Sequence, residues 1–297
     1  MGNHLEAPNE GDWGRRIELS DFDKIADAGF NSIRLPVRWS NHASETAPYA
    51  IDETFMARVE ILVDAALATG LNVVLDDHHY EDLHKNPAAH SDRLGELWRQ
   101  IAARFADRPT DSLWFEIANE PNDQLTNENL LETLAPALAA IRETNPTRAV
   151  IYGGQNWSGI NSLETLRLPD DPHVIPTFHY YDPFAFTHQG ATWVDSPPPL
   201  GRTYGSEEDQ AALTADVEKL RAYIARTGKT PFIGEFGAHT TVPLEGRVPY
   251  YRAVREAFEG EVSGYCAWGY AATFPLYDDA SGAWNPGMLA AMGLAGG

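Results

Sequence analysis

The chain has 297 residues, which suits one α/β barrel or two smaller domains, and 43% of its residues are hydrophobic, enough for a sizeable core. The formal net charge of −21 argues against a nucleic-acid binder, because phosphate contacts need clustered Lys and Arg, and equally against binding to anionic membrane surfaces. Cys266 is the single cysteine, which excludes an intrachain disulfide and a cysteine-based metal cluster.

Helical patterns and short apolar runs alternate along the whole sequence. A first helix is expected to begin at Ser20, which with Asp23 resembles a capping box. The 51–69 segment is the clearest helix, with Asp52 as its N-cap and Gly70 as its stop. Further helical patterns cover 91–106, 126–142 with a kink at Pro136, and 209–227.

Seven apolar runs have the length of strands. They cover 32–39, 72–78, 112–119, 149–154, 174–181, 231–236 and 264–270. Strands separated mostly by helices imply parallel pairing through right-handed crossovers. With one unit per roughly 40 residues and no linker, the sequence predicts a single (β/α)8 barrel over residues 1–297.

Polar and aromatic side chains interrupt these apolar runs late, near the carboxyl end of each predicted strand. One such residue is usually an exposed loop residue, but the same placement on five strands is typical of a barrel active site, which lies at that end. Arg34 instead lies inside its run, where a buried cation needs an anionic partner. The residues at the strand ends are His78, His79, Asn119, Glu120, His179, Tyr181, Glu235 and Trp268.

Glu120 and Glu235 are expected on the same rim of the barrel. Two carboxylates whose environments push their pKa values apart are the machinery of glycoside hydrolysis. Arg34 beside one of them would keep that glutamate ionised as a nucleophile, and Asn119 beside the other suits a sugar hydroxyl. The aromatic side chains suited to the faces of pyranose rings are Tyr181, Trp193 and Trp268.

A metal site is the main alternative at the level of chemistry. The segment 78–84 holds three histidines and two acidic residues, but His78 and His79 are adjacent and would point to opposite faces of a strand. The helical His-Glu-x-x-His spacing is absent, and Gly153-Gly154 lacks the Lys-Ser or Lys-Thr that follows in a phosphate-binding loop. We therefore expect neither a catalytic metal nor a cofactor.

The chain resembles glycoside hydrolase family 5, the retaining cellulases and mannanases that fold as (β/α)8 barrels. The resemblance runs essentially end to end. Within the family, the chain is most similar to endoglucanases of thermophilic bacteria that also accept mannans. The motifs that carry it are GNHLEAPNEGDWG (2–14), GFNSIRLPVRW (29–39), VVLDDHHYEDL (73–83), FEIANEPN (115–122), FHYYDPFAFTHQGATW (178–193), IGEFGAH (233–239) and the segment around Trp268.

The resemblance implies a role for each matching residue. Glu120 corresponds to the general acid/base and Glu235 to the nucleophile, which Arg34 and Tyr181 would orient and keep charged. The remaining inner residues would be His78, Asn119 and His179, with Trp268 forming the floor of the subsite before the cleaved bond. Residues that match sugar-contacting positions with less certainty are Asn3, Glu6, His79, His188 and Trp193.

The sequence departs from the family pattern at two places. Gly269-Tyr270 follows Trp268, where close relatives carry an acidic residue, so the local sugar contacts are expected to differ. Relatives also have a first strand just upstream of Gly2-Asn3, where this chain has Met1. We therefore expect a first strand that is largely missing or truncated, seen either as a gap between the strands at 32–39 and 264–270 or as an abbreviated strand at residues 1–4. An extension upstream by about ten residues would then stabilise the fold.

The leading hypothesis is a retaining endo-β-1,4-glycanase that acts on a β-linked polysaccharide or oligosaccharide as a monomer. The alternatives are a carbohydrate-binding barrel without activity and a metal-dependent hydrolase. A reducing-sugar assay on carboxymethyl-cellulose and mannan would separate the leading hypothesis from the carbohydrate-binding barrel, and a chelator test would separate it from the metal-dependent hydrolase. A polymeric substrate suggests export, yet the opening MGNHLEAPNEGDWG has neither the basic nor the apolar region of a signal peptide, and no run approaches the roughly 20 apolar residues of a membrane span.

Overall fold

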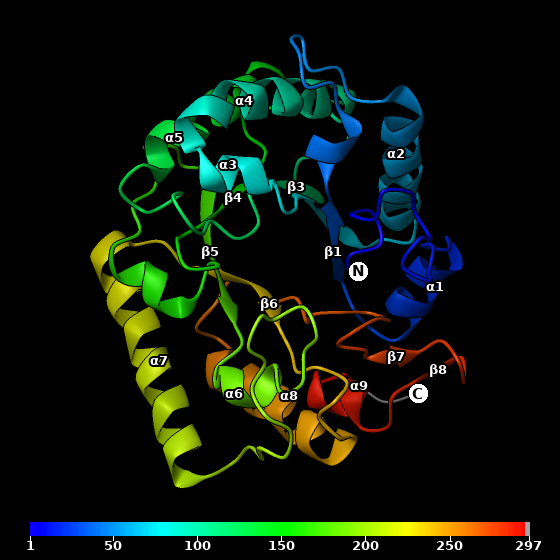
Figure 1. Ribbon diagram of the computed structural model, residues 1–297, viewed down its shortest axis with the longest axis vertical. Coiled ribbons are helices and arrows are strands. Elements are labelled where there is room, and N and C mark those ends of the chain that lie inside the picture. Colours follow the sequence, from blue (N-terminus) through cyan, green and yellow to red (C-terminus); the bar gives the residue numbers. More distant parts are fainter. Residues whose placement is uncertain (295–297) are drawn as a thin grey trace. The chain divides into compact units, whose positions relative to one another are not determined.

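The computed structural model describes residues 1–294 (Figure 1). Contacts between residues divide the chain into two compact units. Unit 2 comprises residues 3–158 and 165–177, and unit 1 comprises residues 1–2, 159–164 and the chain from Phe178 onward. The expected single catalytic domain over residues 1–297 stays a prediction. Within residues 1–294, none of the helices combines the length and the hydrophobicity needed to cross a membrane.

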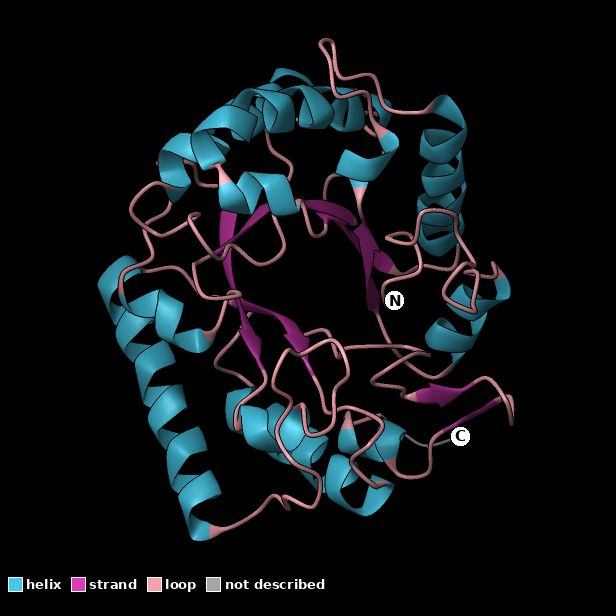
Figure 2. Cartoon of the chain, in the orientation of Figure 1, coloured by secondary structure: helices cyan, strands magenta, loops and turns pink. Residues whose placement is uncertain are grey.

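Unit 2 alternates helices with the first strands of a parallel sheet. Its elements are α1 (Ser20–Asp27), β1 (Ser32–Val37), the 3-10 helix η1 (Trp39–His42), α2 (Glu53–Ala68), β2 (Asn72–Asp77), α3 (Glu81–Lys85), α4 (Pro87–Arg104), β3 (Leu113–Glu116), α5 (Leu130–Thr144), β4 (Val150–Gly153) and the beginning of β5 (Val174–Tyr180). Each strand pairs in parallel with the next one in the chain, as Figure 2 lets the reader follow in magenta.

The strand register places apolar side chains in one continuous layer across the sheet of unit 2. Leu35 of β1 pairs with Leu75 of β2, which pairs with Phe115 of β3, and Phe115 pairs with Val150 of β4. All four side chains are fully or almost fully buried. One residue further along, Asp76 pairs with Glu116, so the acidic residues of β2 and β3 lie side by side directly beyond this apolar layer.

The starts of α1 and α2 in unit 2 differ in how well they follow local sequence signals. The Asp52 carboxylate accepts a hydrogen bond from the Phe55 backbone N–H at 2.8 Å, so the predicted N-cap of α2 is confirmed. The capping box expected at Ser20 is wrong, because Ser20 already lies inside α1 and Leu19 is the N-cap residue. The Asp21 carboxylate instead accepts from the Glu18 backbone N–H at 2.9 Å and pairs with Arg15.

Helices α4 and α5 lie side by side in Figure 1, and a close approach joins them at Gly95. A Cβ atom on Gly95 would come within 2.9 Å of the Pro136 side chain, so only glycine allows α4 to approach α5 this closely. Pro136 lies inside α5, and this helix begins at Leu130, four residues later than the start expected from the sequence.

Unit 1 contains the rest of the secondary structure. Its elements are the 3-10 helix η2 (Ile160–Glu164), the end of β5, α6 (Phe184–Thr187), α7 (Glu207–Thr227), β6 (Phe232–Phe236), α8 (Leu244–Phe258), the two-stranded antiparallel sheet of β7 (Tyr277–Asp278) and β8 (Ala283–Trp284), and α9 (Met288–Ala291). Strand β6 follows β5 in the sheet, whose order is β1 to β6 without interruption.

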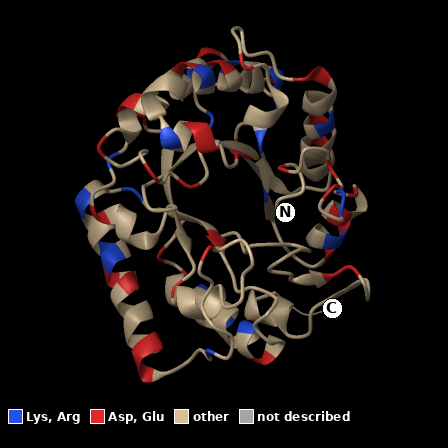
Figure 3. Ribbon diagram, viewed as in Figure 1, with Lys and Arg blue, Asp and Glu red and all other residues tan. Residues whose placement is uncertain are grey.

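Charge and capping agree on the start of α7. Ser206 and Asp209 form a capping box in which the serine hydroxyl accepts from the Asp209 backbone N–H at 3.2 Å and the aspartate accepts from the Ser206 backbone N–H at 3.1 Å. Glu207, Glu208 and Asp209 occupy its first turn, visible as the red lower end of α7 in Figure 3. Negative charge at this end complements the helix dipole.

The expected strand at 264–270 is reduced to a single parallel bridge between Tyr265 and Ile233 of β6. The Ile233 backbone N–H donates to Gly264 at 3.0 Å and the Cys266 N–H donates to Ile233 at 2.9 Å, but the next bond runs from the Trp268 N–H to Phe236 at 2.8 Å. The regular ladder therefore stops after Cys266, and six of the seven expected strands are formed in residues 1–294.

The beginning of the chain pairs over a very short length. Leu5 forms one isolated parallel bridge with Val37 of β1, and its carbonyl accepts from the Arg38 backbone N–H at 3.3 Å. The short first strand that we expected at residues 1–4 thus appears as one bridge at the following residue. In unit 1, the Met1 carbonyl accepts from the Tyr270 backbone N–H at 3.2 Å.

Candidate active site

A buried ion-pair network in unit 2 joins Arg34, inside β1, to acidic residues near the carboxyl ends of β2 and β3. The Arg34 guanidinium holds Glu116 by two bonds of 2.7 and 3.0 Å and pairs with Asp76 at 2.9 Å. It also donates to the Asn119 side-chain oxygen at 2.5 Å. Arg34, Asp76 and Glu116 are almost fully buried, so the charges compensate one another away from water.

The expectation that Arg34 needs an anionic partner is confirmed, but the sequence analysis missed both partners. Asp76 and Glu116 were visible as acidic residues inside the apolar runs 72–78 and 112–119. The even spacing of Arg34 and Pro36, together with the pairing of Pro36 with Asp76, puts these groups on one face of the sheet. That Arg34 keeps Glu235 ionised stays a prediction.

Asn119 and Glu120 follow β3 and are held by their backbone. The Asn119 N–H donates to the Asp77 carbonyl at 3.1 Å, and the Ser158 hydroxyl donates to the Asn119 carbonyl at 3.0 Å. A side chain on Gly153 would collide with that hydroxyl, so glycine is required for the Ser158 contact. The Glu120 side chain is 14% exposed and lies 4.0 Å from His79 Nε2.

The side-chain amide nitrogen of Asn119 is a buried hydrogen-bond donor. It has no hydrogen-bond partner within residues 1–294, whereas the oxygen of the same amide accepts from Arg34. An unpaired buried donor is costly, so this amide would gain from an incoming acceptor such as a sugar hydroxyl.

Glu6, His78 and His79 form a second cluster in unit 2. Glu6 lies 3.4 Å from His78 Nε2 through one carboxylate oxygen and 2.5 Å from His79 Nδ1 through the other, and the Asn3 amide donates to it. Burial alone would raise the pKa of the Glu6 carboxyl, but His78, His79 and Asn3 outweigh burial and lower this pKa.

The two histidines do not face opposite sides, so this part of the sequence analysis is wrong. β2 ends at Asp77, and His79 has a φ of 55°, which breaks the alternation of a strand. Their ring centroids are only 4.3 Å apart and both imidazoles reach Glu6. The argument from strand geometry against a shared ligand therefore fails.

Glu235 is the corresponding carboxylate of unit 1. It lies near the carboxyl end of β6, is 4% exposed, and accepts a hydrogen bond from the Tyr181 hydroxyl at 2.8 Å. His179 Nδ1 lies 3.6 Å from the same carboxylate oxygen. Because β5 ends at Tyr180, the neighbouring strands β5 and β6 deliver all three side chains to one place.

An aromatic cluster in unit 1 surrounds His188. Trp193 is 51% exposed, and its ring meets His239 edge-on at 4.9 Å and lies 5.9 Å from Phe274. Phe184 of α6 stacks on His188 at 4.3 Å. The sequence analysis named His188 and Trp193 but missed His239, Phe274 and Phe184, because a single aromatic residue carries no local signal of its neighbours in space. The pKa of His188 is lowered to about 4, chiefly by burial, so this imidazole is neutral near pH 7.

Trp268 is 8% exposed and its backbone is fixed on both sides. Its N–H donates to Phe236 at 2.8 Å, and its carbonyl accepts from the Tyr251 hydroxyl at 2.9 Å. A side chain on Gly237 would collide with that carbonyl and with the Tyr251 hydroxyl. Gly237, two residues after Glu235, thus allows the Trp268 segment to approach β6.

His84 supports the loop that carries Glu120. The Asn122 amide donates to His84 Nδ1 at 3.0 Å and to the Glu120 carbonyl at 2.8 Å. Burial, assisted by His79, lowers the pKa of His84 to about 4, so the neutral ring can accept this bond.

We expect this histidine to make stability dependent on pH. In the unfolded chain this histidine takes up a proton near pH 6.5, whereas in the folded chain it does so only near pH 4. The neutral ring therefore contributes its full share of the free energy of unfolding above pH 6.5. As the pH falls towards 4, up to about 3 kcal/mol of this free energy is lost. Urea unfolding of the wild type and of His84→Gln at pH 7 and 4.5 measures this. The stability difference should narrow at the lower pH, and a constant difference would contradict it.

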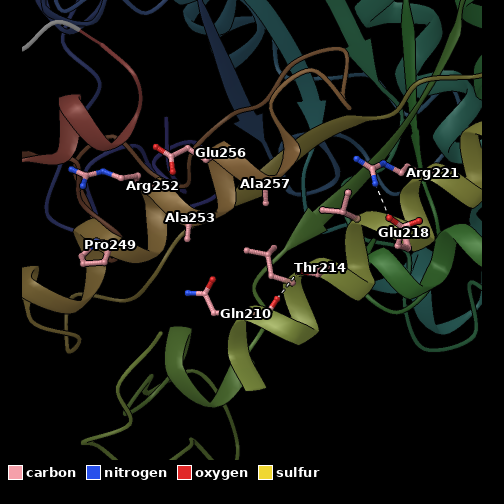
Figure 4. A pocket seen from close by; sticks show the side chains of 11 residues that line it. Gln210, Thr214, Glu218, Arg221, Pro249, Arg252, Ala253, Glu256 and Ala257 are labelled. Atoms are coloured by element: carbon pink, nitrogen blue, oxygen red, sulfur yellow. Dashed lines mark hydrogen bonds and ion pairs between the residues drawn. The ribbon is translucent and has the colours of Figure 1, made fainter. Parts of the chain in front are cut away.

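A groove of about 490 Å³ lies between α7 and α8 and is drawn in Figure 4. Apolar Leu213, Val217 and Ala253 line it together with the ion pair of Arg221 and Glu218 at 2.6 Å. It contains none of the residues that the sequence predicts for the site.

The site residues predicted from the sequence form two groups, one in each unit. Unit 2 holds Asn3, Glu6, Arg34, His78, His79, Asn119 and Glu120, and unit 1 holds His179, Tyr181, His188, Trp193, Glu235 and Trp268.

Comparison with known proteins places these observations in a family context. Residues 2–272 match the model of the cellulase family, glycosyl hydrolase family 5. Endoglucanase H of Acetivibrio thermocellus is 37% identical over 257 residues, which cover 86% of this chain and 27% of that protein. The chain thus spans about a quarter of the length of this curated relative, and 37% of another, Cellulase/esterase CelE of the same organism.

Solved structures match over nearly the full length. Cel5A of Thermotoga maritima in complex with cellobiose is 41% identical with a TM-score of 0.95, covering 98% of this chain and 95% of that one. The complex of the same protein with mannotriose has a TM-score of 0.94 at the same identity and coverage. This likeness confirms the fold class expected from the sequence, in which six parallel strands alternate with helices in the manner of a (β/α)8 barrel.

Proposed function

The chain belongs to the cellulase family, glycosyl hydrolase family 5, and from this premise we propose that it is a retaining endo-β-1,4-glycanase. Its proposed substrates are β-1,4-glucans such as cellulose and glucomannan, with mannan as a further substrate. The glycoside hydrolase assignment and the resemblance to endoglucanases of thermophilic bacteria, both made from the sequence, are confirmed at the level of the family.

The environment of Glu235 is the observation that carries the proposal. Hydrogen bonds to a carboxylate favour its charged form, and the Tyr181 hydroxyl donates one at 2.8 Å while His179 lies 3.6 Å away. An ionised carboxylate at the carboxyl end of a barrel strand is suited to attack an anomeric carbon. This arrangement supports the role of Glu235 as nucleophile.

Glu120 is proposed as the general acid and base. Glu120 follows β3 in unit 2 with a side chain that is 14% exposed, and the amide donor of the preceding Asn119 has no partner among residues 1–294. That donor would bind a hydroxyl of the sugar and so fix the ring relative to Glu120. The neighbouring Glu6 and His79 are proposed to contact the sugar as well.

The mechanism follows from these two roles. The Glu120 carboxylic acid gives its proton to the glycosidic oxygen as the bond from that oxygen to the anomeric carbon breaks, and a Glu235 oxygen bonds to the anomeric carbon. The Glu120 carboxylate then takes a proton from water, whose oxygen displaces Glu235 and restores both residues. Retention requires a carboxylate separation of about 5–5.5 Å, which we expect between these residues.

Exposed aromatic rings fit the apolar faces of the sugars. The half-exposed Trp193 ring is fixed by its contacts with His239 and Phe274, so it loses little freedom when a sugar stacks on it. The backbone N–H and carbonyl of Trp268 are both hydrogen-bonded, which fixes this residue. We propose its ring as the floor of the subsite before the cleaved bond.

A reducing-sugar assay with carboxymethyl-cellulose and with mannan tests the activity, and NMR of the first product from a cello-oligosaccharide tests the stereochemistry. We expect release of reducing ends in the presence of EDTA and first appearance of the β-anomer. No release on either polymer would favour a non-catalytic carbohydrate-binding barrel. Loss of activity with EDTA would favour a metal-dependent hydrolase, and first appearance of the α-anomer would contradict the assignment of Glu235.

A further inference from the structure

We propose that Glu6, His78 and His79 bind one first-row transition-metal dication, such as Zn²⁺ or Cu²⁺, and that this ion inhibits the enzyme. The site lies entirely in unit 2. Binding of the ion is independent of the proposed function, whereas the inhibition rests on it.

The three side chains supply a compact set of donor atoms. Each offers one ligand atom, and these atoms lie within 4.8 Å of one another. The contacts with Glu6 identify the nitrogens as His78 Nε2 and His79 Nδ1. Two imidazole nitrogens and one carboxylate oxygen suit Zn²⁺ and Cu²⁺ rather than Mg²⁺ or Ca²⁺, which prefer oxygen ligands.

The orientation of His78 favours a cation at this point. Its Nδ1 lies 2.6 Å from the Asp76 carboxylate, so Nδ1 carries the proton and donates it to that bond. The other ring nitrogen, Nε2, faces the Glu6 carboxylate at 3.4 Å. A metal ion bound here would take the place of the proton between the two groups and ligate both of them.

A supporting layer already holds the donors in place. Asp76 orients His78 and is itself held by Arg34 at 2.9 Å, and the Asn3 amide donates to Glu6. A carboxylate bound to the far nitrogen of a ligating histidine is the usual outer partner of a metal site, since it fixes the tautomer and increases the basicity of the ligand.

The ion has a way in and room for a further ligand. Glu6 and His78 are almost fully buried, but the His79 side chain is 38% exposed, so one edge of the cluster meets solvent. Three protein ligands leave a fourth position of a tetrahedral ion to water. The net charge of −21 also attracts cations to the protein.

Inhibition follows because the same atoms are proposed to contact the sugar. A metal ion would occupy the Glu6 oxygen and the His79 nitrogen that a sugar hydroxyl would use. We therefore expect Zn²⁺ to raise KM for a cello-oligosaccharide, and EDTA to restore it. The ion takes no part in bond cleavage.

Isothermal titration of the full chain with Zn²⁺, and electron paramagnetic resonance with Cu²⁺, test the site without any activity readout. We expect one ion per chain, nitrogen hyperfine splitting in the Cu²⁺ spectrum, and affinity at least about tenfold lower in His79→Asn. His173→Asn removes a half-buried histidine ahead of β5 and should leave the affinity unchanged. Circular dichroism checks that both variants are folded.

The outcomes separate the two parts of the proposal. No saturable binding, or equal affinity in the wild type and in His79→Asn, would overturn the site. Binding that depends on His79 in a chain that cleaves no glycan would uphold the site and count against the proposed function. An active enzyme that binds Zn²⁺ through His79 with no change in KM would overturn the inhibition.

Discussion

Replacing Glu235 with alanine is expected to lower kcat by about 10⁴-fold or more on every β-1,4-glycan that the enzyme accepts. The variant loses the carboxylate that forms the glycosyl-enzyme, and no other group can take the same position relative to the Tyr181 hydroxyl. Initial rates on a cello-oligosaccharide and on an aryl cellobioside, measured side by side, give the loss. Comparable losses on both substrates identify the nucleophile.

Glu120→Ala is the matched variant because it removes the other carboxylate. A glycosidic oxygen with a poor leaving group needs a proton, whereas an activated aryl group leaves without one, so this variant should retain much more activity on the aryl cellobioside than on the oligosaccharide. If Glu120→Ala loses both activities equally, Glu120 is not the general acid. If Glu235→Ala keeps its activity on the aryl cellobioside, Glu235 is not the nucleophile.

Arg34→Met is expected to reduce the free energy of unfolding by about 3–5 kcal/mol. Methionine fills most of the volume of the arginine, but it leaves Glu116 and Asp76 buried without the cation that compensates them. The charge of these two carboxylates, rather than a cavity, is therefore the source of the loss. Denaturant unfolding at pH 7 measures it, and kcat should fall more than KM rises.

A double variant separates charge from packing. Adding Glu116→Gln to Arg34→Met removes one of the two uncompensated charges, so it should recover part of the lost stability. If the loss of unfolding free energy in the double variant equals the sum of the losses in the two single variants, Arg34 and Glu116 are not coupled energetically. A stable Arg34→Met would mean that the carboxylates are protonated or hydrated without the arginine.

The positions of the site residues could be predicted because parallel strands impose a common direction. Polar residues that follow apolar runs, such as Glu120 and Glu235, lie at the carboxyl ends of β3 and β6 in the structure. Residues inside the runs were harder to assign. Asp76 and Glu116 appeared as interruptions of apolar strands, and only the strand register shows that they share Arg34.

Other features had no signal in the sequence. Alternation along a strand predicts the face of a side chain only while the strand continues, and it failed at His79 because β2 ends two residues earlier. Hydrogen-bond pairing cannot be read from hydrophobicity, so the run 264–270 looked like a full strand although it forms a single bridge. Contacts of Phe274 with Trp193 and His239 join loops that are distant in the sequence.

The contact of Ser158 with the Asn119 carbonyl has a consequence for related sequences. The space for the Ser158 hydroxyl exists only because residue 153 has no side chain. Positions 153 and 158 should therefore vary together among relatives: where 153 gains a methyl group, 158 should lose its hydroxyl and become glycine or an equally small residue. Substitution at either position alone should be tolerated less well than a paired substitution. The two positions are therefore expected to covary next to the proposed acid/base residue.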